Sequence, residues 1–117
     1  MTESFKAYKQ RREEGNNALL DTDSLAIKRF VGLDKTVYKE GALSVANKEL
    51  LGLVASAVLR CNDCIDYHLE RCVEEGFSKA EIDEAMSVAL IIGGSIVIPH
   101  ARHAAQTIET LLSTETP

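Results

Sequence analysis

The stretch that decides the fold is CNDCIDYHLERCVEEGFSKAE, residues Cys61–Glu81. Up to Glu75 its apolar residues recur every three or four positions, which is the period of an amphipathic helix with one packed face. Gly76 follows as a helix stop. Ser78 and Glu81 then have the spacing of a capping box that opens another helix. The stretch therefore predicts two helices joined by a short turn.

The remainder of the 117 residues gives the same indication, with only two prolines and no alternating apolar pattern bounded by turn residues. Pro99 is compatible with the first turn of a last helix or with a kink. We expect an all-α fold, a single compact multi-helix domain over residues 1–117. Its helices are expected at about 3–20, 23–39, 44–59, 61–75, from 79 onward and from 95 to 112, with a frayed tail at 113–117.

Charge and hydropathy exclude several classes of partner. The chain has 18 acidic against 13 Lys and Arg residues, a net charge of −5, so neither nucleic acid nor an anionic membrane is an expected partner. The longest apolar stretches are shorter than the roughly 18 residues of a spanning helix. The N-terminus is charged and has no apolar signal segment, which predicts a cytoplasmic protein.

All three cysteines, Cys61, Cys64 and Cys72, lie within the quoted stretch. In a reducing compartment a C-x-x-C pair indicates redox or metal chemistry rather than a structural disulfide framework. Residues three apart on a helix have Cα atoms roughly 5 to 6 Å apart, so Cys61 and Cys64 can be oxidised to a disulfide without unfolding. A helix N-terminus also favours the thiolate, which is the nucleophilic form of cysteine.

His68 stands one helical turn after Cys64, where it can accept the proton of the thiol. The helical period places both residues on the packed face, together with Cys61 and Cys72. The solvent face is expected to carry Asp66, Glu70, Arg71 and Glu74. A histidine in a packed face needs a polar partner, and Glu49 is the candidate, because it shares a helix face with the small residues Gly52 and Ser56.

Other interpretations remain open beside this cluster. Cys61, Cys64, His68 and Cys72 could ligate zinc, although all would lie on one helix. Cys72 is otherwise a small buried apolar residue. His100 and His103 could share a metal, or mark a partly exposed face or a subunit contact. Tyr38 and Tyr67 are interpreted as packing residues, and Gly93–Gly94 as a helix break or a close-packing point.

Glu49, Cys61, Cys64 and His68 form the pattern Glu-x11-Cys-x-x-Cys-x-x-x-His, which resembles the carboxymuconolactone decarboxylase and alkylhydroperoxidase D superfamily. The resemblance extends over 47–95 in order and spacing, with a family core at about 43–112. It implies an all-helical domain that assembles into homo-oligomers, trimers or hexamers, with the site near subunit contacts. No cofactor is expected.

The resemblance also implies roles and partners. Cys64 would attack a peroxide, Cys61 would resolve the sulfenic acid to a disulfide, and Glu49 and His68 would relay protons. An external dithiol, a lipoyl group or a thioredoxin-like protein, would restore the thiols. Asp63 departs from the pattern, because alkylhydroperoxidase D has a histidine there, and a carboxylate disfavours the thiolate of Cys64.

The expected function is therefore a thiol-dependent peroxide-reducing oxidoreductase. The alternatives are a noncatalytic redox-sensing or scaffold oligomer, and a carboxymuconolactone decarboxylase-type enzyme. The decarboxylase branch of the superfamily lacks the cysteine pair, which argues against the second alternative.

Overall fold

The computed structural model describes residues 3–114, and within these residues it contains six α-helices, one short 3-10 helix and no strand. The predicted all-α fold class is confirmed. The predicted tail begins inside the last helix, which continues through Thr114, and residues 115–117 lie outside the described part.

The chain divides into two compact units, residues 1–40 and 41–117. The first unit contains α1 (Phe5–Leu20) and α2 (Leu25–Val37). Each helix is preceded by an N-cap serine, Ser4 or Ser24, whose hydroxyl accepts a backbone N–H of the first turn. The prediction that residues 1–117 form a single domain stays a prediction.

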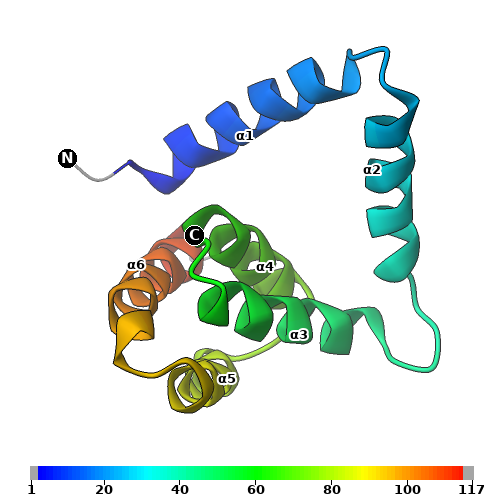
Figure 1. The fold of residues 1–117 in the computed structure, drawn as a ribbon. Coiled ribbons are helices and arrows are strands. Elements are labelled where there is room, and N and C mark those ends of the chain that lie inside the picture. Colours follow the sequence, from blue (N-terminus) through cyan, green and yellow to red (C-terminus); the bar gives the residue numbers. More distant parts are fainter. Residues whose placement is uncertain (1–2, 115–117) are drawn as a thin grey trace. The chain divides into compact units, whose positions relative to one another are not determined.

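The second unit contains α3 (Val45–Val58), α4 (Asn62–Glu74), α5 (Lys79–Gly93), the 3-10 helix η1 (Ser95–Val97) and α6 (Ile98–Thr114). α3 packs against α4 and α5, and α4 packs against both α3 and α6 (Figure 1). α4, the helix that follows the C-x-x-C pair, is thus covered on two sides. The core between these helices is built from the fully buried side chains of Leu53, Ile65, Leu69, Ile82, Ala89, Val97 and Ile108.

The helix ends of this unit follow the signals in the sequence. The predicted capping box is confirmed, because Ser78 Oγ accepts the N–H of Glu81 at 3.1 Å and the Glu81 carboxylate accepts the N–H of Ser78 at 2.8 Å. Gly76 ends α4 in the left-handed region at a φ of 96°. Pro99 lies in the first turn of α6, where its missing N–H costs no hydrogen bond.

Gly93, the last residue of α5, and Gly94 after it have the two roles predicted for the pair, a close-packing point and a helix break. Gly94 ends α5 with a φ of 82°, a conformation that favours glycine. A Cβ at Gly93 would lie 2.5 Å from Val97 Cγ2, so a side chain at Gly93 would collide with η1. Among the described residues, no helix is both long and apolar enough to cross a membrane.

Candidate functional site

Cys61 and Cys64 form a disulfide at the start of α4, with their Cα atoms 5.3 Å apart. Cys61 is the N-cap of the helix, and its Sγ accepts the backbone N–H of Cys64 at 3.2 Å. Cys61 is half-buried and Cys64 is exposed. The prediction that Cys64 lies on the packed face is wrong, because the whole first turn of α4 is exposed and packing starts only at Ile65.

The turn between α3 and α4 fixes the backbone of the pair. Arg60 adopts the left-handed conformation at a φ of 62°, which is uncommon for a residue other than glycine. Its N–H donates to Ala57 O, and the N–H of Cys61 donates to Ser56 O, each at 3.0 Å. These two bonds are those of a Schellman motif. Cys61 therefore belongs both to the end of α3 and to the cap of α4.

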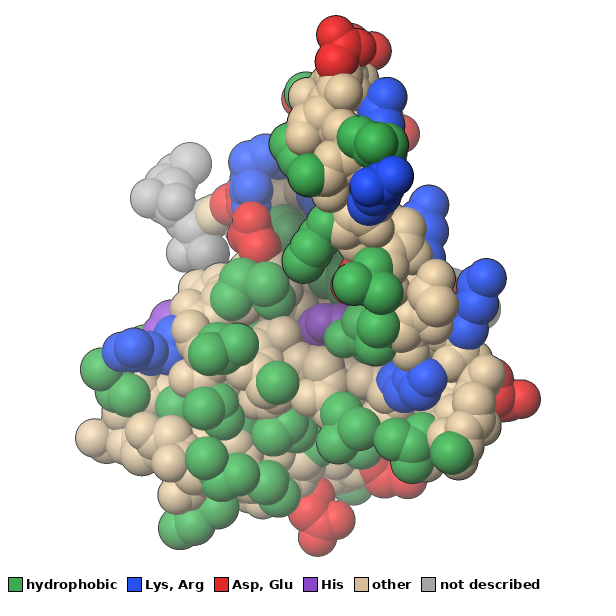
Figure 2. All heavy atoms as spheres, turned by 45° about the vertical axis from the view of Figure 1, so that its right-hand side comes forward, with side chains coloured by type: hydrophobic (Ala, Val, Ile, Leu, Met, Phe, Trp, Pro, Cys, Tyr) green, Lys and Arg blue, Asp and Glu red, His purple; other side chains and the backbone are tan. Residues whose placement is uncertain are grey.

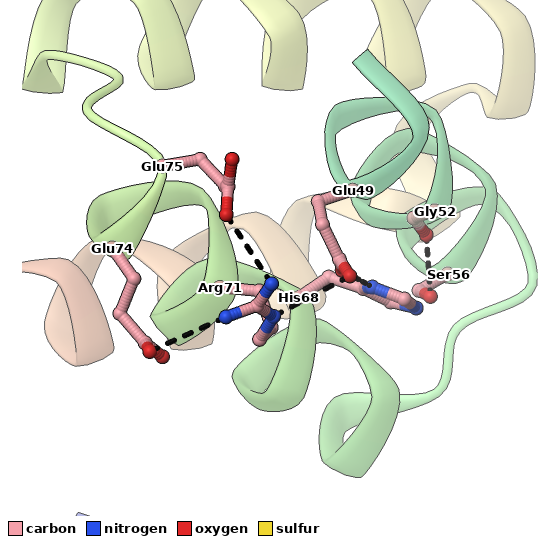
Figure 3. A network of polar contacts seen from close by, with 7 residues as sticks. All are labelled: Glu49, Gly52, Ser56, His68, Arg71, Glu74 and Glu75. Atoms are coloured by element: carbon pink, nitrogen blue, oxygen red, sulfur yellow. Dashed lines mark hydrogen bonds and ion pairs between the residues drawn. The ribbon is translucent and has the colours of Figure 1, made fainter. Parts of the chain in front are cut away.

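Glu49 of α3 and His68 of α4 meet inside the unit, at exposures of only 2% and 9%. His68 Nδ1 and Glu49 Oε1 are 2.8 Å apart (Figure 3). The small residues Gly52 and Ser56 lie on the same stretch of α3, and the Ser56 hydroxyl donates back to Gly52 O. An ionised carboxylate can only accept, so this bond places the proton of a neutral imidazole on Nδ1. Nε2 is then the nitrogen that can accept a further proton.

Arg71 is a member of this cluster that the sequence reasoning placed on the solvent face. Its Nε donates to Glu49 Oε2 at 3.5 Å, while Nη1 and Nη2 donate to Glu74 and Glu75, each at 3.3 Å (Figure 3). The side chain is 30% exposed. The guanidinium therefore spans from solvent to the buried carboxylate, a reach that only a long side chain allows.

Asp66 is not on a solvent face either, and that prediction is wrong. The side chain is 5% exposed, because α6 packs against this side of α4. Its Oδ1 lies 2.9 Å from His103 Nε2 and accepts the hydroxyl of Thr107 at 2.7 Å. A second carboxylate and histidine thus join α4 to α6. The signal in the sequence was a stripe of polar residues at helical spacing on α6, at His100, His103 and Thr107.

His100 and His103 each contact α4, and His100 Nδ1 lies 2.7 Å from Asn62 Oδ1. Within the described residues, no group of three or more His, Cys, Asp and Glu side chains is placed to hold a metal ion. The four possible zinc ligands in the sequence, Cys61, Cys64, His68 and Cys72, do not form a metal site in this structure, because Cys61 and Cys64 are bonded to each other.

Cys72 is fully buried, as the sequence predicted. Burial, followed by the negative charge of Glu49, raises the pKa of its thiol to about 12. Cys72 is therefore a neutral thiol near pH 7, in contrast to a reactive cysteine. Tyr38 and Tyr67 are both half-buried, and the ring of Tyr67 meets that of His68 edge to face.

The model of the carboxymuconolactone decarboxylase family matches residues 25–107. The chain belongs to this family. A carboxymuconolactone decarboxylase family protein from Thermotoga maritima, known from a crystal structure, is 53% identical, with a TM-score of 0.88 over 92% of both chains. Alkyl hydroperoxide reductase AhpD of Mycolicibacterium paratuberculosis is 34% identical over 79 residues, which are 68% of this chain and 43% of AhpD. The predicted family resemblance is confirmed.

An uncharacterised protein of the cox locus in Paracoccus denitrificans is also similar, at 29% identity over 82 residues, 70% of this chain and 74% of that protein. The relatives in the carboxymuconolactone decarboxylase family thus include one named for peroxide reduction and others without an assigned activity. The chain spans less than half of the AhpD length, so the AhpD activity is not carried over by similarity alone.

Proposed function

We propose that the protein is a thiol-dependent, peroxide-reducing oxidoreductase that cycles Cys61 and Cys64 between dithiol and disulfide. One observation carries the proposal: the pair closes at the exposed first turn of α4, one turn before a histidine held by a buried glutamate. The name of the AhpD relative supports the same chemistry. So does the Thermotoga maritima relative, which has been considered for involvement in an antioxidative response.

In the first step, Cys64 acts as the nucleophile. His68 Nε2 takes the thiol proton, and the sulfur attacks the terminal oxygen of the peroxide. The S–O bond forms as the O–O bond breaks, which yields a sulfenic acid on Cys64. The imidazolium returns the proton to the departing alkoxide, which leaves as an alcohol. The charge of Glu49 stabilises the imidazolium in between, at a distance of 2.8 Å.

In the second step, Cys61 resolves the sulfenic acid. Its sulfur attacks Cys64 Sγ, the S–S bond forms, and the hydroxyl group leaves as water with the thiol proton of Cys61. The balance is one peroxide and two thiols converted to one alcohol, one water and one disulfide. The Cα separation of 5.3 Å accommodates this bond without rearrangement of the helix.

An external dithiol, a lipoyl group or a thioredoxin-like protein, completes the cycle. Its thiolate attacks Cys64, the exposed sulfur, and Cys61 leaves as a thiolate. The N–H of Cys64, which points at Cys61 Sγ, and the helix N-terminus stabilise that leaving group. A second thiol of the reductant then displaces Cys64 and leaves the reductant as its own disulfide.

The proposed enzyme is a homo-oligomer, a hexamer or a trimer. Apolar side chains stand at the surface of the protein (Figure 2), and in the second unit Val88, Ile91, Ile92, Ile96 and Ile98 are all more than a third exposed. Exposed apolar residues that gather in one segment of the chain, here between 88 and 98, favour a subunit interface. Light scattering is expected to give a multiple of the 12.8 kDa chain mass, and a monomer at micromolar concentration would contradict the oligomer.

The experiment that tests the function is peroxide consumption with a panel of dithiol reductants. An enzyme consumes many peroxides per subunit, whereas a redox sensor stops after one. We expect Cys64→Ser to abolish consumption and Cys61→Ser to retain a single turnover that ends at the sulfenic acid. Cys72→Ser serves as the matched control, with turnover retained. If no reductant sustains more than one turnover in assembled protein, the enzyme proposal fails.

A further inference from the structure

Arg71 is the charged neighbour of the Glu49–His68 pair for which the proposed mechanism has no role. Glu49 is almost fully buried, and each of its oxygens has a different partner. Oε1 faces His68 Nδ1 at 2.8 Å, and Oε2 accepts Arg71 Nε at 3.5 Å. The carboxylate is thus held between a group that can gain or lose a proton and a group that cannot.

The guanidinium is itself fixed from its far side. Nη1 and Nη2 donate to Glu74 and Glu75, three and four positions along the chain from Arg71, so all three side chains lie on one face of the chain segment that ends α4. These two bonds orient the planar fork so that Nε points inward at Glu49 (Figure 3). Arg71 therefore presents a permanent positive charge to the buried carboxylate from a defined direction.

The position of that charge decides where a proton resides. A buried carboxylate with histidine as its sole partner favours the imidazolium, because the positive charge on the ring offsets its own. An imidazolium cannot accept the proton of Cys64. With Arg71 in place, the carboxylate already has a cation beside it, and an additional proton on the pair is repelled by that cation. This repulsion acts whether the proton resides on His68 or on Glu49.

We propose that Arg71 is a positioning residue that keeps His68 neutral, with Nε2 able to accept the Cys64 proton, near neutral pH. The inference rests on the proposed function for its catalytic consequence. It assigns the peroxide reaction a dependence on a residue that contacts neither peroxide nor the redox sulfurs.

Other charged and titratable groups lie near the Glu49–His68 pair, and their placement does not reverse the direction of the effect of Arg71. Glu74 is largely exposed, and Glu75 is partly buried at 29% exposure. Both pair with the guanidinium, so they weaken the effect of its charge, but they remain in place when Arg71 is replaced, and the removal of one positive charge keeps its direction. Cys72 is a neutral thiol, and its pKa is raised to about 12. Asp66 and His103 face each other across the α4–α6 contact. These neighbouring groups are Glu49 from α3, Asp66, Tyr67, Arg71, Cys72 and Glu74 from α4, Glu75 at its C-cap, and His103 from α6.

The test is the pH dependence of the reaction of reduced protein with peroxide, together with NMR titration of the His68 ring. In Arg71→Gln, the acidic limb of the rate profile and the His68 titration should both move to higher pH, by about one unit. One unit is a small shift for a charge near a titrating group, chosen because Arg71 is part-exposed and the Glu49 carboxylate lies between it and His68. At pH values below the acidic limb, the rate of Arg71→Gln should be about tenfold lower than that of the wild type. At high pH the two rates should be equal.

Two variants separate charge from structure. Arg71→Lys keeps the charge and should keep both curves near the wild-type position. Arg102→Gln removes an exposed arginine of α6 and should leave them unchanged. The proposal is overturned if Arg71→Gln titrates at or below the wild-type pH, or if Arg71→Lys shifts as far as Arg71→Gln. A shifted His68 titration in protein that reduces no peroxide would instead refute the proposed function alone.

If Arg71→Gln fails to assemble, a pair of variants without an uncompensated buried charge answers the same question. Glu49→Gln removes the carboxylate, and Glu49→Gln with Arg71→Met removes both charges. In the double variant, the His68 ring should take up its proton at higher pH than in Glu49→Gln. Coincident titrations in the two proteins would overturn the proposal.

Discussion

Asp66 gives the sharpest prediction about stability, because the sequence pattern and the structure assign it opposite environments. Oδ1 accepts from both His103 and Thr107 across the contact between α4 and α6. Asp66→Ala leaves two donors without their acceptor at a buried position. Each such loss costs about 1 to 3 kcal/mol, and His103 is partly accessible to water, so we expect a loss of about 2 to 4 kcal/mol in the free energy of unfolding.

The assay is urea unfolding followed by circular dichroism at one fixed subunit concentration, since assembly contributes to stability. Asp66→Asn keeps an oxygen acceptor and should cost less than Asp66→Ala. Thr107→Val removes a single donor and should cost about 1 kcal/mol. Asp83→Ala is the matched control, because Asp83 forms an exposed pair with Lys79 that contributes at most about 0.5 kcal/mol. Equal stabilities of Asp66→Ala and Asp83→Ala would refute the buried network.

Three further outcomes are expected. In reduced native protein at pH 8, a thiol reagent should modify two cysteines quickly and Cys72 only after denaturation. The raised pKa of Cys72 keeps it a thiol at every pH well below about 12, and three fast thiols would contradict this. Gly93→Ala should lower the free energy of unfolding by about 1 to 3 kcal/mol through the clash with Val97. Gly15→Ala is the control and should not destabilise, because a Cβ at Gly15 has no neighbouring atom within 4 Å. Similar effects of the two substitutions would refute the close packing. Asp63→Asn should speed the reaction of Cys64 with peroxide a few-fold by removing a neighbouring negative charge, and an unchanged or slower rate would count against that electrostatic effect.

The helices and their ends could be predicted because their signals are local. The capping box at Ser78 and the stop at Gly76 are properties of a few adjacent residues, and the structure has both. The contact of Glu49 with His68 followed from two helical periodicities and the small residues of α3. Each of these inferences needed only the shape of one helix or of two neighbouring helices.

The environments of Asp66 and Cys64 could not be predicted in the same way. A single helical wheel gives α4 one packed face, but α3 and α6 cover it from two sides. The donors to Asp66 come from residues 37 and 41 positions later in the chain. Cys64 is exposed because neighbouring helices leave the first turn of α4 uncovered, which depends on where α3 ends and not on the period of α4.

The most direct test of the central claim is the rate at which fully reduced protein reacts with peroxide in a single turnover at pH 7. If Glu49 and His68 activate Cys64, His68→Gln and Glu49→Gln should each lower the rate constant by roughly 10- to 1,000-fold. The double variant should be little slower than the slower single variant, because residues that act as one unit are not additive. Part of the rate should return at high pH, where Cys64 ionises without a base. Wild-type rates in both single variants, in protein that assembles normally, would show that the buried pair only supports the helix contact.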